Sequence, residues 1–169
     1  MRELKDLAEA VTEFTSRAAE KLRTQGHHAC RVLVFIHTSP FRRGEPQYSK
    51  AITVPLRLPT SDTAQLVRAA LHALRAIYKE GFNFAKAGIH LLELEPAWVE
   101  QKELPLDESP HGRDELMSAM DRINARYGHG SLYLASAGTA GARREWTMRR
   151  GLKTPEYTTR LADLPVAVL

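Results

Sequence analysis

The chain has 169 residues, of which 43% are hydrophobic, and a formal net charge of +4. This length suffices for one ordinary domain, with or without a small appendage. No apolar run approaches the ~20 residues that a membrane span needs, and the first residues lack the uninterrupted apolar segment of a secretory signal. A single cysteine, Cys30, excludes an internal disulfide and favours a reduced, cytoplasmic protein with no membrane partner.

Charged residues are unevenly distributed along the chain. Basic pairs occur at 42–43, 143–144 and 149–150, whereas residues 93–108 are largely acidic. A moderate positive charge permits binding to a polyanion, but it is also common among globular proteins that bind no nucleic acid. The net charge alone therefore does not assign a partner.

The chain begins with a helix pattern followed by two strand patterns. Residues 3–24 place apolar side chains at spacings of three and four before Gly26, which predicts an amphipathic helix. Residues 30–37, CRVLVFIH, predict a buried strand. Residues 48–57 predict a second strand, and Pro55 near its end indicates an edge or exit position.

A second helix and a third strand come next. Asp62 is predicted to cap the helix, with Gln65 at the capping-box position, and the apolar stripe continues to Gly81. Residues 84–94 predict the third strand. The order helix, strand, strand, helix, strand is the split βαβ pattern without its first strand, whose place another segment such as 131–135 could fill. The predicted fold class is α+β, a small sheet with two helices on one face.

The remaining residues predict a linker and a smaller subdomain. Residues 95–112 contain three prolines and several acidic residues, as is typical of a linker. A helix at about 113–126, a glycine-flanked strand at 131–135 and a basic tail follow. The predicted organisation is a sheet domain over 1–94, the linker, and a small α/β C-terminal appendage over 113–169.

Several segments together resemble a known family. These are AGIHLLELEP, LMSAMDRIN, Trp146-x-Met148 and PEYTTR, supported upstream by IHTSPF and YSKAITVPL. Over essentially the whole chain they are similar to the C-terminal part of UmuC, the catalytic subunit of the SOS error-prone polymerases in the bacterial Y family. The resemblance implies that residues 1–94 form a little-finger DNA-binding domain and that the fingers, palm and thumb lie in an upstream part of a longer polymerase.

The residues offer no obvious catalytic or metal site. Polymerisation needs palm carboxylates that hold two metal ions, whereas Asp107 and Glu108 stand in a proline-bounded linker and are better explained as solvated surface. His27-His28-x-Cys30 lacks a second ligand pair at the usual spacing and predicts a helix-to-strand turn. We expect no catalytic residue, metal or other cofactor in this chain, although the polymerase that it resembles would use magnesium at its palm.

Candidates for contacts with a DNA primer-template lie on and beside the predicted sheet. Lys86 and His90 share one face of the third strand, while Ile89 and Leu91 point to the helices. The resemblance implies that the face opposite the helices contacts the phosphate backbones. The further candidates are Ser49 and Lys50 in the hairpin and Arg42 and Arg43 in the loop before it. Such contacts position a duplex without reading its sequence; the alternative for each residue is a solvated side chain.

The linker and the tail contain candidate protein-binding segments. The resemblance implies a sliding-clamp-binding peptide at Gln101, Leu104 and Leu106, where an extended segment inserts a glutamine amide and apolar anchors into a groove. This copy is degenerate, because Pro105 and Leu106 replace the usual aromatic residue.

The tail candidates are Trp146, Met148, Tyr157 and Arg160. The resemblance implies the processed UmuD dimer and the RecA filament as their partners, whereas the alternative is that these residues close the subdomain over the helix at 113–126. The function predicted from the sequence is a non-catalytic, DNA-engaging and clamp-tethering region of a translesion polymerase. Two alternatives stay open, a protein–protein interaction module whose basic face is incidental and a free-standing enzyme of unknown type.

Overall fold

A computed structural model describes residues 1–42, 44–98, 113–138 and 146. The elements in chain order are α1 (Leu4–Thr24), β1 (His27–Thr38), β2 (Ser49–Thr60), α2 (Thr63–Ile77), β3 (Phe84–Pro96), α3 (Arg113–Tyr127) and the short 3-10 helix η1 (Ala135–Ala137). Within these ranges, none of the helices is long and apolar enough to cross a membrane.

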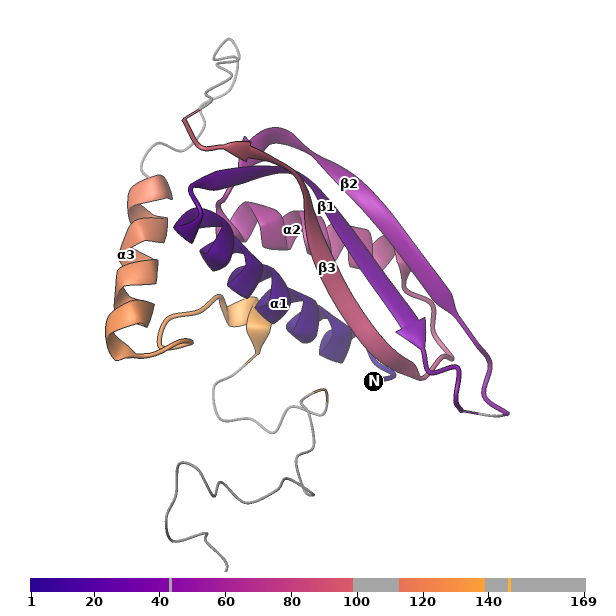
Figure 1. Cartoon of the computed structure of the whole chain (residues 1–169). Helices are drawn as coiled ribbons and strands as arrows, with labels where there is room; N and C mark the ends of the chain where they lie inside the picture. Colours follow the sequence, from indigo (N-terminus) through magenta and orange to yellow (C-terminus); the bar gives the residue numbers. More distant parts are fainter. Residues whose placement is uncertain (43, 99–112, 139–145, 147–169) are drawn as a thin grey trace, which may run out of the picture.

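The three strands form one antiparallel sheet in the order β2-β1-β3. Helices α1 and α2 lie together on one side of this sheet, and α3 stands beyond α1 (Figure 1). In the part of the chain that the structure describes, no helix covers the other side of the sheet. The predicted α+β class, with two helices on one face, is therefore confirmed.

The core lies between the sheet and the two helices. Alternate residues of the central strand, Val32, Val34 and Ile36, are completely buried. The helices face them with the apolar stripes that the spacing predicted, which include Leu7, Val11, Leu22, Leu66, Ala70 and Leu74. Each large aliphatic side chain buried in this way stabilises the fold by about 1.5–3 kcal/mol. One face of the sheet therefore packs against the two helices, and the other face is not covered by any described helix.

Both ends of α2 have their backbone groups satisfied by side chains. The Asp62 carboxylate accepts a hydrogen bond from the Gln65 N–H at 2.8 Å, which confirms the predicted cap. At the other end the Tyr48 hydroxyl donates to the Ile77 carbonyl at 2.7 Å. Helix α2 therefore ends at Ile77 rather than at the predicted Gly81, because a side chain from the hairpin occupies a terminal carbonyl.

The outer edges of the sheet differ. At β3, the Met1 amino group donates to the Phe84 carbonyl at 3.0 Å, and the Phe84 N–H donates back to the Met1 carbonyl at 2.8 Å. Two such reciprocal bonds are one rung of an antiparallel pair, and Figure 1 shows the N-terminus beside this end of β3. The β2 edge instead carries Pro55 and Pro59, which have no N–H to offer. The place of the missing strand is therefore beside β3.

The strand predicted at 131–135 is wrong. Gly128 and Gly130 adopt positive φ angles of 103° and 83°, which turn the chain after α3. The Asn124 side chain then donates to the Leu132 carbonyl at 2.9 Å and accepts from the Leu132 N–H at 2.8 Å. Because this side chain occupies both backbone groups, Leu132 needs no neighbouring strand. The described part of the appendage is helical and does not fill the first-strand position.

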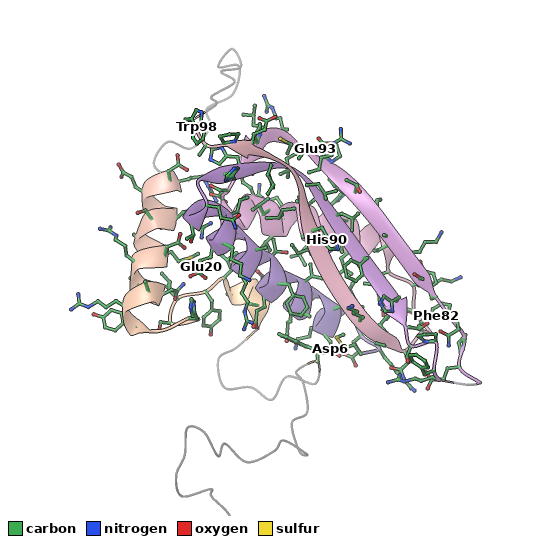
Figure 2. The ribbon with its side chains drawn as sticks, in the orientation of Figure 1. Asp6, Glu20, Phe82, His90, Glu93 and Trp98 are labelled. Carbon is green, nitrogen blue, oxygen red and sulfur yellow. The ribbon has the colours of Figure 1, made fainter. Side chains whose placement is uncertain are left out.

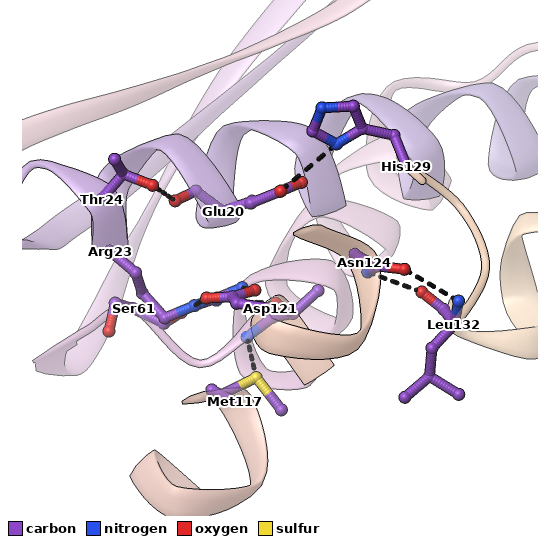
Figure 3. A network of polar contacts seen from close by, with 10 residues as sticks. Glu20, Arg23, Thr24, Ser61, Met117, Asp121, Asn124, His129 and Leu132 are labelled. Carbon is purple, nitrogen blue, oxygen red and sulfur yellow. Dashed lines mark hydrogen bonds and ion pairs between the residues drawn. The ribbon is translucent and has the colours of Figure 1, made fainter. Parts of the chain in front are cut away.

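Polar contacts attach α3 to the sheet domain (Figure 3). Two nitrogens of Arg23 in α1 donate to the Asp121 carboxylate of α3, each at 2.7 Å. The third nitrogen donates to the Ser61 carbonyl at 2.7 Å and to the Thr63 hydroxyl at 2.9 Å. The single guanidinium of Arg23 therefore joins α1, the turn before α2, and α3.

Candidate nucleic-acid interface

The uncovered side of the sheet is built from alternate residues of all three strands. We call it the open face, and it comprises Arg31, Leu33, Phe35 and His37 of β1, Ser49, Ala51, Thr53 and Pro55 of β2, and Lys86, Gly88, His90 and Leu92 of β3. These residues alternate with the buried core positions, as the pleat of a strand requires. Their side chains therefore point away from the helices.

Polar side chains line up across the open face. The register places Lys86 opposite His37, and His37 opposite Ser49. Since neighbouring strands lie about 4.8 Å apart, this row sets an ammonium group, an imidazole and a hydroxyl at regular intervals. His37 Nδ1–H donates to the Thr38 carbonyl at 3.0 Å, which fixes the ring. His90 lies midway along β3 (Figure 2).

Phe35 organises the middle of the open face and was missed in the sequence. Its ring lies against Gly88, where an added Cβ would be only 2.4 Å from the Phe35 Cζ atom. The ring is nearly parallel to those of His37 and His90, with interplanar angles of 14° and 26° and centroid distances of 6.2 and 5.5 Å. The absence of a side chain at Gly88 therefore allows Phe35 to hold both imidazoles. In the sequence, the one signal for this arrangement is that Phe35 shares its side of the strand with polar residues. That signal does not reveal that Gly88, in another strand, lies opposite Phe35.

Negative charge on the open side is confined to one end. The Glu93 carboxylate, near the C-terminal end of β3 in Figure 2, pairs with Arg31 at 2.8 Å. Both side chains are half exposed, so this pair contributes at most about 1 kcal/mol to stability. Burial, together with a hydrogen bond to Glu95, raises the pKa of the nearby Cys30 thiol and makes it a poor nucleophile. The end of the open face that contains Lys86 and His37 carries no carboxylate among its residues.

The structure places most of the strand candidates as the alternation predicted. Lys86 and His90 are both exposed on the open face, and Ser49 joins them across the sheet. Lys50 is different, because it pairs with the buried Ile36 and belongs to the side of β2 that faces the helices. Lys50 therefore does not share a surface with the other strand candidates.

The loop and tail candidates are only partly described. Arg42 is exposed and lies 3.5 Å from Glu45 in an ion pair within the loop. The Trp146 ring meets Phe14 of α1 edge to face, with centroids 5.8 Å apart and an interplanar angle of 74°. Trp146 therefore lies against α1, and its role in partner binding stays a prediction. Outside the described residues lie Arg43, Gln101, Leu104, Leu106, Met148, Tyr157 and Arg160.

The motif His27-His28-x-Cys30 lies in β1, which begins at His27, so the predicted turn is wrong. The Nδ1–H of His27 donates to the Gln25 carbonyl at 2.6 Å. Among the residues that the structure describes, no group of three or more His, Cys, Asp or Glu side chains is placed to hold a metal ion.

Comparison with known proteins identifies two matched parts. Residues 1–104 match the impB/mucB/samB family C-terminal domain, and residues 114–167 match a domain of unknown function, DUF4113. The chain is 38% identical to Protein UmuC of Salmonella typhimurium over 161 residues, which are 94% of the chain and 37% of that relative. It is 40% identical to Protein SamB of the same organism over 164 residues, which are 96% of the chain and 38% of that relative.

Protein MucB of Escherichia coli is 36% identical over 170 residues, or 98% of the chain and 38% of the relative. The chain therefore spans less than two fifths of the length of these relatives. The matched residues include the whole described sheet and both of its covering helices. The predicted resemblance to UmuC is confirmed, and the chain belongs to the impB/mucB/samB family, of which it contains the C-terminal domain.

Proposed function

We propose that the open face binds the phosphate backbone of a DNA primer-template on behalf of a UmuC-like translesion polymerase. The observation that carries this proposal is the row formed by Lys86, His37 and Ser49, which lie in register. Lys86 and Ser49 are exposed and His37 is half-buried, while Glu93, near the other end of the sheet, is paired with Arg31. Ammonium, imidazole and hydroxyl groups are common donors to phosphate oxygens. An extended, regularly spaced row suits a repeating backbone better than it suits a small ligand.

We assign no catalytic step to this chain. Phosphoryl transfer with two metal ions requires carboxylates gathered on one surface, whereas the acidic side chain at the edge of the open face, Glu93, is paired with an arginine. The magnesium ions of a complete polymerase would belong to its palm. The contribution of this region is to hold the polymerase on DNA.

Binding of a fluorescently labelled primer-template, measured by anisotropy at several salt concentrations, tests this function. Three or four phosphate contacts give a log-log slope of about −3. Lys86→Glu should weaken binding at least ~10-fold at low salt, since it removes one contact and adds repulsion. Lys5→Glu makes the same charge change at an exposed position of α1, and this variant should bind DNA like the parent protein. Equal losses in both variants, or no binding at low salt, would refute the proposal.

We further propose that residues 101–106 tether the protein to the sliding clamp. The support is the predicted motif with Gln101, Leu104 and Leu106, which lies at the end of the first matched part, residues 1–104. A weak tether raises the local concentration of the DNA-binding domain, so that two weak contacts suffice together. Changing Gln101 and Leu104 together to alanine should abolish clamp binding in a pull-down while DNA affinity is retained. Loss of both activities would show that the segment is structural.

A second function, protein binding through the C-terminal part, is favoured by an exposed apolar stripe on α3. Leu116, Ile123 and Tyr127 are 58%, 39% and 68% exposed. With Met120 they follow spacings of four, three and four, which place them on one side of the helix. The processed UmuD dimer and the RecA filament are the candidate partners. Ile123→Asp should abolish co-sedimentation with one of them without changing DNA binding.

A further inference from the structure

Helix α2 carries a set of basic side chains that were not among the candidates predicted from the sequence. Arg68, His72 and Arg75 are exposed and follow spacings of four and three, so they lie on one side of the helix. The sequence of α2, TAQLVRAALHALRAI, contains no aspartate or glutamate. The three side chains span about 10 Å along the axis, given a rise of 1.5 Å per residue. This surface is separate from the open face, because α2 covers the other side of the sheet (Figure 1).

Among the residues that the structure describes, the basic side chains of α2 have no acidic partner. Within the described ranges, Arg68, His72 and Arg75 take part in no ion pair and no side-chain hydrogen bond. The neighbouring helix α1 differs, because its cations alternate with carboxylates and include an ion pair between Arg17 and Glu13. The two helices of one layer therefore have different charge patterns, and the exposed face of α2 carries basic but no acidic side chains.

A groove adjoins this face where α2 meets the edge strand β2. It has a volume of about 340 Å³, with Leu56, Leu58 and Ala69 as apolar lining and Arg57, Arg68 and His72 as basic lining. The volume is at the lower end of the range for small-ligand sites. Apolar surface beside cations suits a nucleotide, whose base or sugar would cover the leucines while its phosphate meets the arginines.

We propose that α2 and this groove form a second nucleic-acid site, which binds single-stranded nucleic acid. The backbone would follow Arg68, His72 and Arg75, and one nucleotide would enter the groove beside β2. A single strand suits this site better than a duplex, because only an unpaired base can cover the apolar lining while its phosphate meets the basic side chains. Stacking and backbone contacts of this kind tolerate any sequence. The site uses a different surface from the open face and does not depend on its proposed function.

Binding of a labelled oligothymidylate of about 12 nucleotides, measured by anisotropy across a salt series, tests this site. The variant with Arg68→Glu and Arg75→Glu should bind ~10-fold or more weakly at low salt, with a log-log slope reduced by about 1.4, as expected for two lost single-strand contacts. The pair Arg68→Lys and Arg75→Lys should retain most of the affinity, because phosphate accepts a point charge. Lys86→Glu on the open face should weaken this binding less than the variant with Arg68→Glu and Arg75→Glu does, because Lys86 lies outside the proposed site.

The matched control changes Lys5 and Lys21 to glutamate on α1, where both residues are exposed, and makes the same change in net charge. An equal loss in this control would overturn the site, since net charge alone would then explain the binding. The site would also be overturned if the parent protein did not bind oligothymidylate at low salt, or if the Lys86→Glu variant lost this binding completely. An abasic oligomer that binds as tightly as oligothymidylate would overturn the role of the groove. Equal melting temperatures by circular dichroism confirm that the variants are folded.

Discussion

The contact between Arg23 and Asp121 tests whether α3 and the sheet domain unfold as one unit. It joins the two parts of the chain that match different families, residues 1–104 and 114–167. The Arg23 side chain is 12% exposed and that of Asp121 is 27% exposed, so both groups are largely removed from water. Replacing Arg23 with alanine deletes four hydrogen bonds and leaves the carboxylate partly buried without its partner.

The expected cost follows from this partial burial. Breaking a fully buried ion pair costs about 3–5 kcal/mol, and the exposure of Asp121 reduces this to ~2 kcal/mol for Arg23→Ala. Asp121→Ala should cost only ~1 kcal/mol, because Arg23 keeps its bonds to Ser61 and Thr63. The double variant should therefore cost less than the sum of the two, with a coupling energy of ~1 kcal/mol.

Urea unfolding of the four proteins of this cycle, followed by far-ultraviolet circular dichroism and by tryptophan fluorescence, measures the coupling. Both signals should change in one transition if α3 belongs to the cooperative unit. Arg17→Ala is the control, since the Arg17 side chain is 70% exposed and its pair with Glu13, one turn away on the same helix, should contribute less than ~0.5 kcal/mol. Additive losses, or a separate early transition for α3, would refute the reasoning.

Three further changes test individual contacts. Gly88→Ala should destabilise the protein by about 1–3 kcal/mol in urea unfolding, and prior replacement of Phe35 by alanine should remove most of this cost, because the clash is with that ring. Burial raises the pKa of Asp62, but hydrogen bonds from Arg113 and the α2 backbone outweigh it and hold the pKa below its usual value. The unfolded state then binds the proton more tightly than the folded state does. Lowering the pH below about 4 should therefore reduce the free energy of unfolding more in the parent protein than in the Asp62→Asn variant, and equal reductions in the two proteins would contradict this. Asn124→Ala should cost ~1 kcal/mol and speed hydrogen exchange in the turn that it holds, which unchanged exchange would disprove.

Strand alternation predicted the sides of the sheet but not its pairing. Ile89 and Leu91 pack against the core while Lys86 and His90 are exposed, as a period of two requires. The contact between Phe35 and a glycine in another strand depends on register, which links positions far apart in the sequence. The centre of the open face was therefore beyond what local pattern could predict.

The two other differences between the sequence-based predictions and the structure have local causes. The segment 131–135 has the apolar character of a strand, but the Asn124 side chain satisfies its backbone and glycine turns precede it. The basic residues of α2 do not stand out in the sequence, because Arg68, His72 and Arg75 are three or four residues apart. They become neighbours only when the segment forms a helix. Since α2 was correctly predicted, this surface could have been found from the sequence.

Local charge, rather than the net charge of +4, should therefore determine where this protein meets a polyanion. Carboxylates occur on α1, on α3 and at the C-terminal end of β3, while the Lys86 end of the open face and the exposed side of α2 have none among their residues. Screening in physiological salt limits the reach of each charge to about 8 Å, so distant acids cannot cancel these cations. The two proposed sites lie on opposite sides of one sheet, so a duplex at one and a single strand at the other would not compete for the same surface.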